Sequence, residues 1–324
     1  MTRWVDGYAL GTFSDETRVF AGIVSGDRVL PLDSVGPVVT PTTVRDLLEH
    51  WDVVGPRVQE LATTFDRDQS LPLEGLAVLA PLEPRQIIQV GANYRSHVAQ
   101  VVISDRAPGD TRSDEELRRY ADETMDELKR SGKPFFFTGL PSAVCGPDDD
   151  VLLPAEAKRV DWEVELAVVI GATAHRVPAE RAMEYVAGYT VCNDISARDL
   201  QFSPEHKPLG GDWLRAKNRP TFLPTGPFVV PAELVPDYRQ LELTLDLNGE
   251  RKQSDLPANL LYDVPALIAA ASQAALLYPG DLLLTGSPAG NGGFWQQWLQ
   301  PGDVMEAGIA GIGYQHNTCQ AEPR

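Results

Sequence analysis

The hydrophobic residues of the chain gather in short runs that glycine and proline turns separate. The runs at 166–170, 228–230, 241–247 and 282–285 have the length and composition of β-strands. Asn248-Gly249 follows the third run, and this dipeptide between alternating residues predicts a hairpin turn. The regular alternation of strands and helices typical of a doubly wound sheet is missing. We therefore expect a β-rich α+β fold.

The first 80 residues carry a separate pattern, which predicts a small N-terminal α/β domain. Residues 19–30 are typical of a hairpin, and a helical pattern follows at 43–51 with a threonine as its N-cap. Prolines then mark a boundary, and the strand-like residues 86–90 open the main domain, which we place at 84–324.

Residues 101–132 differ in composition from their surroundings, because they contain nine acidic and six basic residues. Ser113 and Glu116 form a capping-box pattern, and Gly132 follows the basic pair Lys129-Arg130 as a stop signal. The pattern predicts a charged helix with a thin apolar stripe. A solvated helical insertion and a lid over a site are both open interpretations.

Composition narrows the class of protein. The chain has 324 residues, a net charge of −18 and a hydrophobic fraction of 43%, which is typical of a globular fold. This acidic balance disfavours nucleic acids and anionic membranes as partners. Cys145, Cys192 and Cys319 lack the spacing of a disulfide framework or a zinc site. The sequence shows no secretory signal, so we expect a cytoplasmic protein. Two prolines interrupt the uncharged run at 264–280, which we expect to form a buried helix and not a membrane span.

Three carboxylates stand in positions that suit a metal site. On a strand Glu163 and Glu165 share one face, and Asp194 ends a later apolar strand. Two solvated glutamates and an aspartate helix cap would give the same pattern. As a set without histidine or cysteine, however, these oxygens suit a hard cation such as Mg²⁺.

Several motifs follow one another in order between residues 86 and 313, and together they resemble the fumarylacetoacetate hydrolase family. They are Val90-Gly91-Ala92-Asn93-Tyr94-Arg95-Ser96-His97, Asp161-Trp162-Glu163-Val164-Glu165-Leu166-Ala167, Asn193-Asp194-Ile195-Ser196-Ala197-Arg198-Asp199-Leu200-Gln201, Ala216-Lys217-Asn218, Asn248-Gly249-Glu250, Pro279-Gly280-Asp281 and Gly286-Ser287-Pro288-Ala289-Gly290. The resemblance implies a mixed β-sandwich-roll catalytic domain, a homodimer, and a divalent metal ion held by Glu163, Glu165 and Asp194. Mg²⁺ is the expected ion, with Mn²⁺ or Ca²⁺ as alternatives.

The resemblance also assigns roles to residues around that metal. It implies that Lys217 neutralises an enolate and that His97 is a general base that activates water. It places the substrate contacts at Tyr94, Arg198, Gln201 and Ser287. Without the resemblance, each of these side chains has an ordinary interpretation. Lys217 would be a surface lysine, His97 a structural histidine, and Arg198 an arginine paired with a carboxylate.

The chain departs from the family pattern at three positions. Gln100 stands where many members have the glutamate that pairs with the histidine, so we expect His97 to be a weaker base unless an acid such as Asp105 replaces that partner. Gly139 stands where many members have a lysine near the substrate carboxylate. Ser287 in place of threonine is a mild change.

These residues lead to three functional hypotheses. The first is a divalent-metal-dependent hydrolase that cleaves a C–C bond in a β-diketo acid, such as an acylpyruvate or a fumarylacetoacetate-like compound. The second is a decarboxylase, hydratase or isomerase of 2-oxo acids in aromatic-compound catabolism, which Gln100 favours slightly. The third is a protein that binds metal and ligand and has lost catalysis. In each case the partner is a small oxo acid.

Overall fold

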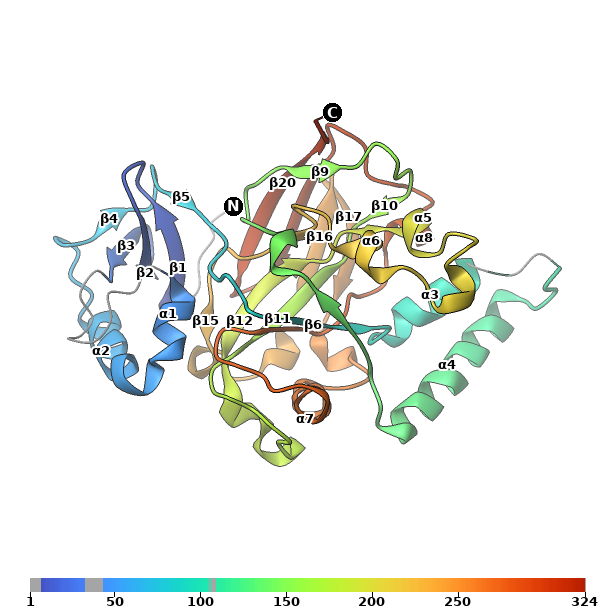
Figure 1. Ribbon diagram of the computed structural model, residues 1–324, viewed down its shortest axis with the longest axis horizontal. Coiled ribbons are helices and arrows are strands. Elements are labelled where there is room, and N and C mark those ends of the chain that lie inside the picture. Colours follow the sequence, from blue (N-terminus) through green and yellow to red (C-terminus); the bar gives the residue numbers. More distant parts are fainter. Residues whose placement is uncertain (1–6, 33–42, 105, 107–108, 324) are drawn as a thin grey trace.

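The computed structural model describes residues 7–32, 43–104, 106 and 109–323. These residues form an N-terminal sheet with two helices beside a larger strand-rich body (Figure 1). Asp105 lies outside the described residues. No helix within the described ranges is both long and apolar enough to cross a membrane.

The N-terminal sheet has the order β4-β3-β2-β1-β5 and is mainly antiparallel hairpins. The predicted hairpin is confirmed as β2 and β3, which pair from Gly22 with Pro31 to Ser25 with Arg28. The helix after Thr43 is confirmed too, with a capping box between Thr43 and Asp46. The elements are β1 (Ala9–Ser14), β2 (Val19–Ser25), β3 (Arg28–Pro31), β4 (Leu71–Pro72), β5 (Ala77–Val78), α1 (Val44–Glu49) and α2 (Trp51–Thr64).

The larger body is built on two sheets. The first has the order β15-β12-β11-β18-β6-β7, and the second has the order β17-β16-β19-β20-β9. The first contains β6 (Ile87–Gly91), β7 (Phe135–Gly139), β11 (Val164–Ile170), β12 (Val186–Asn193), β15 (Val230–Pro231) and β18 (Leu282–Leu284). The second contains β9 (Val151–Leu153), β16 (Leu243–Leu247), β17 (Glu250–Asp255), β19 (Val304–Ile309) and β20 (Gly313–Ala321). Two short pairs, β8 (Val144–Cys145) with β14 (Leu223–Pro224) and β10 (Val160–Asp161) with β13 (Ser196–Ala197), complete the strands of the described residues.

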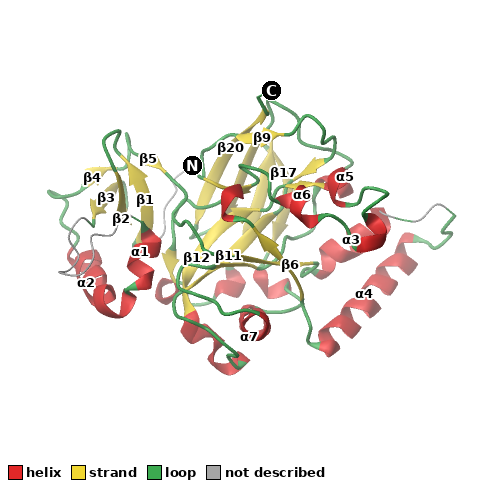
Figure 2. Cartoon of the chain, viewed as in Figure 1, coloured by secondary structure: helices red, strands yellow, loops and turns green. Residues whose placement is uncertain are grey.

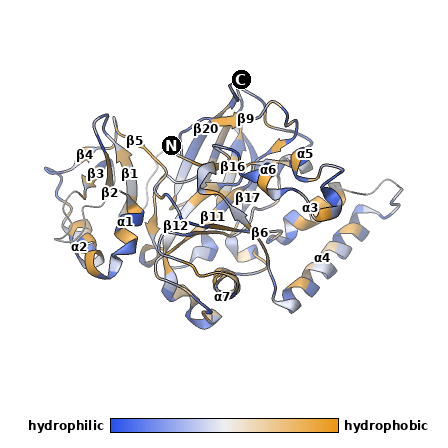
Figure 3. Ribbon diagram, viewed as in Figure 1, coloured by the Kyte–Doolittle hydropathy of each residue, from blue (hydrophilic) through white to orange (hydrophobic). Residues whose placement is uncertain are grey.

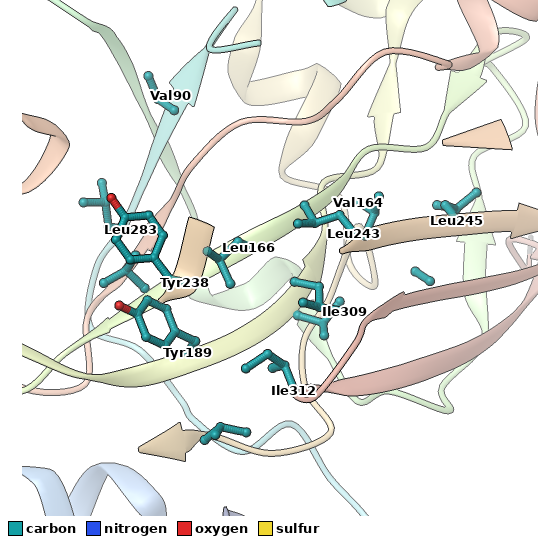
Figure 4. Close-up of a cluster of buried hydrophobic side chains, with 14 of the residues drawn as sticks. Val90, Val164, Leu166, Tyr189, Tyr238, Leu243, Leu245, Leu283, Ile309 and Ile312 are labelled. Carbon is teal, nitrogen blue, oxygen red and sulfur yellow. The ribbon is translucent and has the colours of Figure 1, made fainter. Parts of the chain in front are cut away.

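Strand β11 is buried at every position, and its two faces contribute to two different clusters. Val164, Leu166 and Val168 belong to one cluster with residues of the second sheet such as Leu245 and Ile309. Figure 4 shows Val164 and Leu166 in this cluster. Ala167 and Val169, on the opposite face, join a cluster that includes residues of the N-terminal sheet. A strand covered on both faces has no polar face to show, which explains the continuous apolar run in the sequence.

The helices connect and flank these sheets (Figure 2). They are α3 (Arg95–Ser104), α4 (Asp114–Ser131), α5 (Arg198–Gln201), α6 (Trp213–Lys217), α7 (Val264–Ala274) and α8 (Gly292–Trp295), with 3₁₀ turns η1 (Pro141–Ala143), η2 (Ala179–Tyr185), η3 (Lys207–Leu209), η4 (Ala232–Leu234), η5 (Tyr238–Gln240) and η6 (Pro257–Asn259). The uncharged run at 264–280 gives α7, as predicted, although the helix already ends at Ala274.

The charged segment 101–132 contains the predicted helix, α4, at one edge of the molecule. Ser113 and Glu116 make both hydrogen bonds of a capping box, and Gly132 ends the helix in the left-handed conformation. Hydrophobic and hydrophilic residues alternate along α4 (Figure 3). Its buried residues are Leu117, Ala121 and Met125, and it packs against α3. The helix is therefore attached to the body through a narrow apolar stripe and a few polar contacts, among them the Arg95–Asp126 ion pair and the hydrogen bond that the Tyr262 hydroxyl donates to the Leu128 carbonyl.

Candidate functional site

The three carboxylates meet where β11 and β12 pair. Glu163 directly precedes β11, Glu165 lies inside it, and Asp194 directly follows β12. The backbone N–H of Asp194 donates to the carbonyl of Glu163 at 2.9 Å, which fixes the two chain ends side by side. One ligand oxygen from each carboxylate lies within 4.8 Å of the others, and all three residues are buried.

Two cations contact this cluster, Lys217, which is buried, and Arg198, which is partly buried. Lys217 of α6 places its Nζ 2.7 Å from Glu163 Oε2 and also donates to Asp194 Oδ2. Arg198 of α5 donates from Nη2 to Glu163 Oε1 at 2.6 Å and from Nε to Asp161 Oδ2 at 2.9 Å. Its Nη1 lies 3.3 Å from Gln201 Oε1. Arg198 thus lines the site, but each of its nitrogens already donates to an oxygen of the protein.

The carboxylates of the site outnumber its cations. Asp161, Glu163, Glu165 and Asp194 supply four carboxylates, whereas Lys217 and Arg198 supply two cations. Burial, and then the neighbouring Asp194 and Glu163, raise the pKa of Glu165 well above its usual range. Burial also raises the pKa of Glu163, but Arg198, Lys217 and His97 outweigh it and hold that pKa far below the usual value.

A divalent cation fits these residues. It would supply the two positive charges that four carboxylates and two cations leave missing. Asp194 Oδ1 is buried and has no hydrogen-bond partner among the described residues, which leaves it available as a ligand. Glu165 Oε2 accepts a hydrogen bond of 2.6 Å from the backbone of Gly286, and this contact orients the carboxylate. Oxygen ligands of this kind are typical of hard cations.

Gly286 reaches Glu165 because its backbone adopts a conformation that favours glycine. Its φ of +94° is in the left-handed region, and a Cβ there would lie 2.9 Å from Cβ of Asn93. The next residue, Ser287, lines the cavity, and its hydroxyl accepts a hydrogen bond from Gln253 at 2.9 Å.

His97, in the first turn of α3, faces the carboxylates. Its Nε2 lies 3.7 Å from Glu163 Oε1, and its Nδ1 has no partner among the described residues. Burial, together with the charges of Arg198 and Lys217, lowers the pKa of His97 to about 4 despite the opposite effect of Glu163. The imidazole is therefore uncharged at neutral pH and can accept a proton.

Two predicted site residues lie elsewhere. The side chain of Gln100 accepts a hydrogen bond of 2.7 Å from the backbone of Gly290, so it orients the glycine loop and not His97. Tyr94 is fully buried, and its hydroxyl has no partner within the described part of the chain. The walls of the cavity include neither residue. Gln201 does line the cavity, and its buried Nε2 is without a described partner.

Gly139 lies on β7, and neighbouring side chains fill the space that a larger residue would need at this position. A Cβ at this position would lie 2.9 Å from Oε1 of Gln89 and 3.0 Å from Cγ2 of Ile87. The buried side chain of Gln89 therefore occupies the space into which a residue larger than glycine would extend.

The cavity above the carboxylates has a volume of about 370 Å³ and an aromatic wall that the sequence analysis missed. Phe135 and Phe137 lie on one face of β7, and Trp213 of α6 packs against both, with ring centroids 5.3 and 4.6 Å away. Alternation along Phe135-Phe136-Phe137 predicts the shared face. Trp213 comes from a distant segment, and nothing in its local sequence indicates this contact. Further lining residues are Val98, Val101, Leu128, Lys133, Phe202, Leu261 and Tyr262.

Comparisons with known proteins agree with this arrangement. A family model described as the C-terminal domain of fumarylacetoacetate hydrolase matches residues 86–320. The mitochondrial oxaloacetate tautomerase Fahd2a of Rattus norvegicus is 33% identical over 291 residues, which cover 89% of this chain and 82% of the relative.

Solved structures show the same fold. That of 2-hydroxyhepta-2,4-diene-1,7-dioate isomerase from Mycobacterium marinum has a TM-score of 0.69 and 28% identity, and the match covers 98% of this chain and 100% of that one. Maleylpyruvate hydrolase from Sphingobium sp. SYK-6 has a TM-score of 0.73 and 25% identity, with 97% and 99% covered. The relatives thus include a tautomerase, an isomerase and a hydrolase.

Proposed function

The chain belongs to the fumarylacetoacetate hydrolase family, and we propose that it is a metal-dependent enzyme that moves a proton between carbon and oxygen of a 2-oxo acid, as a tautomerase or isomerase does. The observation that carries the proposal is the position of His97, whose Nε2 lies 3.7 Å from Glu163 Oε1 and whose Nδ1 has no carboxylate partner among the described residues. Similarity to an oxaloacetate tautomerase and to an isomerase supports the same reaction class.

Glu163, Glu165 and Asp194 would hold the metal ion. When bound, a divalent ion supplies a Lewis acid that polarises the oxo group and makes the neighbouring C–H more acidic. We expect Mg²⁺, because the ligands are all carboxylate oxygens, and Mn²⁺ or Ca²⁺ would suit the same ligands.

Lys217 stabilises negative charge on the substrate oxygen. Its ammonium group has three N–H donors, of which Glu163 and Asp194 accept two. The third remains for a substrate oxygen in the cavity that Lys217 lines. Because the group is buried, this donor acts in a medium of low dielectric, where it stabilises developing charge strongly.

His97 takes the proton from the carbon next to the oxo group and returns it to another atom of the substrate. A base whose pKa is about 4 is free of a proton at neutral pH. Proton transfer to and from the substrate needs no activated water, so it does not need the acidic partner that Gln100 fails to provide.

Hydrolysis of a C–C bond in a β-diketo acid is the second candidate. One observation favours it, because Glu163 Oε1 lies 3.7 Å from His97 Nε2 and is ionised. This carboxylate would offset part of the charge on an imidazolium formed when His97 deprotonates water.

Proton exchange with deuterated water tests the proposal. With Mg²⁺ present, we expect NMR to show deuterium entering carbon 3 of 2-oxobutanoate, and His97→Gln to slow this exchange by roughly 10²-fold. We expect Glu163→Gln and Asp194→Asn to abolish both metal binding and exchange. Glu184→Gln, at an exposed glutamate outside the cavity, is the matched control.

Two outcomes would contradict these assignments. Exchange no faster than in buffer, with bound metal verified by calorimetry, would exclude the proton-transfer function. Wild-type metal affinity in Glu163→Gln would show that the ligand assignment is incorrect. Hydrolysis of acylpyruvates in the absence of exchange would select the second candidate.

A further inference from the structure

The cavity changes character within a short distance of the carboxylates. At its base are Glu163, Asp194 and Lys217, whereas the wall beyond them is built mainly from hydrocarbon. The charged base and the aromatic wall adjoin each other, because Nζ of Lys217 lies 5.2 Å from the centroid of the Phe137 ring. A substrate whose oxo acid group is held at the base therefore extends along an aromatic surface.

The aromatic wall is a connected set of rings. Trp213 is its centre, because it packs against Phe137 at 4.6 Å, against Phe135 at 5.3 Å and edge-on against Phe202 at 6.2 Å. These rings come from β7, from α6 and from the residue that follows α5. Such a set offers both stacking and edge contacts to a further ring.

The outer part of this wall is exposed, although its side chains are large and apolar. Phe135 is 54% exposed, Phe202 is 42% exposed and Leu128 is 41% exposed, and all three line the same cavity. Apolar side chains that gather at the mouth of a cavity mark a binding surface, whereas scattered exposed ones need no explanation.

From this arrangement we infer that the substrate carries a bulky apolar group, with an aryl group fitting best, on the carbon chain beyond its 2-oxo acid. The inference rests on the proposed function and names the class of substrate for the same site. The oxo acid stays at the carboxylate base, and the apolar group lies against Phe137 and Trp213, with Phe135 and Leu128 at the outer end.

The same wall disfavours a small dicarboxylic acid. The face of an aromatic ring carries partial negative charge, so a second carboxylate placed against Phe137 or Trp213 would be repelled and would lose hydration. Lys133, two residues before Phe135, is the cation of the lining that a second carboxylate would have to reach from the ring surface. Oxaloacetate should therefore bind more weakly than an aryl-substituted 2-oxo acid of similar length.

Calorimetry with two matched acids tests the inference. We would measure the binding of 2-oxobutanoate and of 2-oxo-4-phenylbutanoate to the Mg²⁺-loaded full chain. The two compounds share the same 2-oxo acid unit and differ by one phenyl group. We expect the phenyl compound to bind at least about tenfold more tightly. Phe135→Ala and Trp213→Ala should each reduce this ratio by about fivefold or more.

Phe294→Ala is the matched control. Phe294 is 47% exposed, which is close to the 54% of Phe135, but it does not line the cavity. This variant should keep the wild-type ratio of affinities. Because Trp213 shares α6 with Lys217, Phe135→Ala provides the decisive result if Trp213→Ala does not fold.

The possible outcomes separate the inference from the function on which it rests. Equal or weaker binding of the phenyl compound, with normal binding of 2-oxobutanoate, would overturn the inference and leave the proposed function in place. Binding of neither acid to the metal-loaded protein would overturn both. If Phe135→Ala instead abolishes self-association in sedimentation and leaves the ratio unchanged, the exposed rings form a subunit interface and the inference fails.

Discussion

His97 is held without charge by its surroundings, and this has a consequence for stability. Burial and the nearby cations lower its pKa to about 4 in the folded chain, against about 6.5 in an unfolded one. Between these values the unfolded chain binds a proton that the folded chain does not. The contribution of His97 to the free energy of unfolding therefore decreases as the pH falls from 6.5 to 4, by on the order of 3 kcal/mol.

Urea unfolding at several pH values, with a chelator present, measures this effect. His97→Gln should lose the part of the pH dependence between 6.5 and 4, because its side chain does not titrate. His316→Gln, at a histidine whose side chain is 57% exposed, is the control and should keep it. An identical pH dependence in wild type and His97→Gln would show that His97 does not cause it.

The sequence predicted the identity of the carboxylates better than the roles of their neighbours. Glu163, Glu165 and Asp194 are recognisable because strand periodicity and the ends of strands are local properties. The roles of Arg198 and Gln100 depend on atoms far away in the chain, namely Asp161 and Gly290. Their hydrogen bonds could therefore be seen only in three dimensions.

At the scale of elements, α4 depends on its N-cap. The hydroxyl of Ser113 accepts from the backbone of Glu116, and the carboxylate of Glu116 accepts from the backbone of Ser113. This helix is attached to the body by a narrow apolar stripe and a few polar contacts, so little tertiary packing compensates for a lost cap. Ser113→Ala should destabilise α4 by about 1 kcal/mol.

Hydrogen exchange followed by mass spectrometry locates this loss. Amides of α4 should exchange about fivefold faster in Ser113→Ala, with little change in β11 or β12. Glu123→Ala, at an exposed position inside the same helix, is the control, because alanine is a good helix former. Equal protection of α4 in wild type and Ser113→Ala would contradict a role for the cap.

Capping boxes and hairpin turns were predictable because each involves a few neighbouring residues. The start of α2 is harder to recognise, because a regular helical pattern is visible only from about residue 58, whereas the structure begins the helix at Trp51. Val54 and Val58 are both buried one turn apart, but Pro56 between them obscures the helical signal. The short strand β15 is likewise smaller than its apolar run predicts.

At the scale of the whole molecule, the N-terminal sheet and the larger body share their cores. Leu10 and Val229 exchange backbone hydrogen bonds of 2.9 and 2.8 Å, and the rings of Phe13 and Phe228 pack 6.1 Å apart. Both hydrophobic clusters contain residues from each part. We expect the chain to unfold as one cooperative unit.

Calorimetry tests this coupling. The calorimetric and van't Hoff enthalpies should agree, and Phe228→Ala should lower the stability of the whole chain by about 3–5 kcal/mol in a single transition. Val19→Ala, at an exposed position of β2, should change it little. Two separate transitions in the wild-type protein would show that the N-terminal sheet unfolds independently.

The position of α4 also bears on how such a chain changes over generations. The carboxylates are anchored on the paired strands β11, which is buried at every position, and β12, which is buried over most of its length, so most substitutions there are costly. Leu128 is part of a helix at the edge of the molecule, and Phe135 lies on the terminal strand of its sheet. After a gene duplication, replacements at these two peripheral positions can therefore change the substrate that is accepted, while the residues that carry the reaction stay the same.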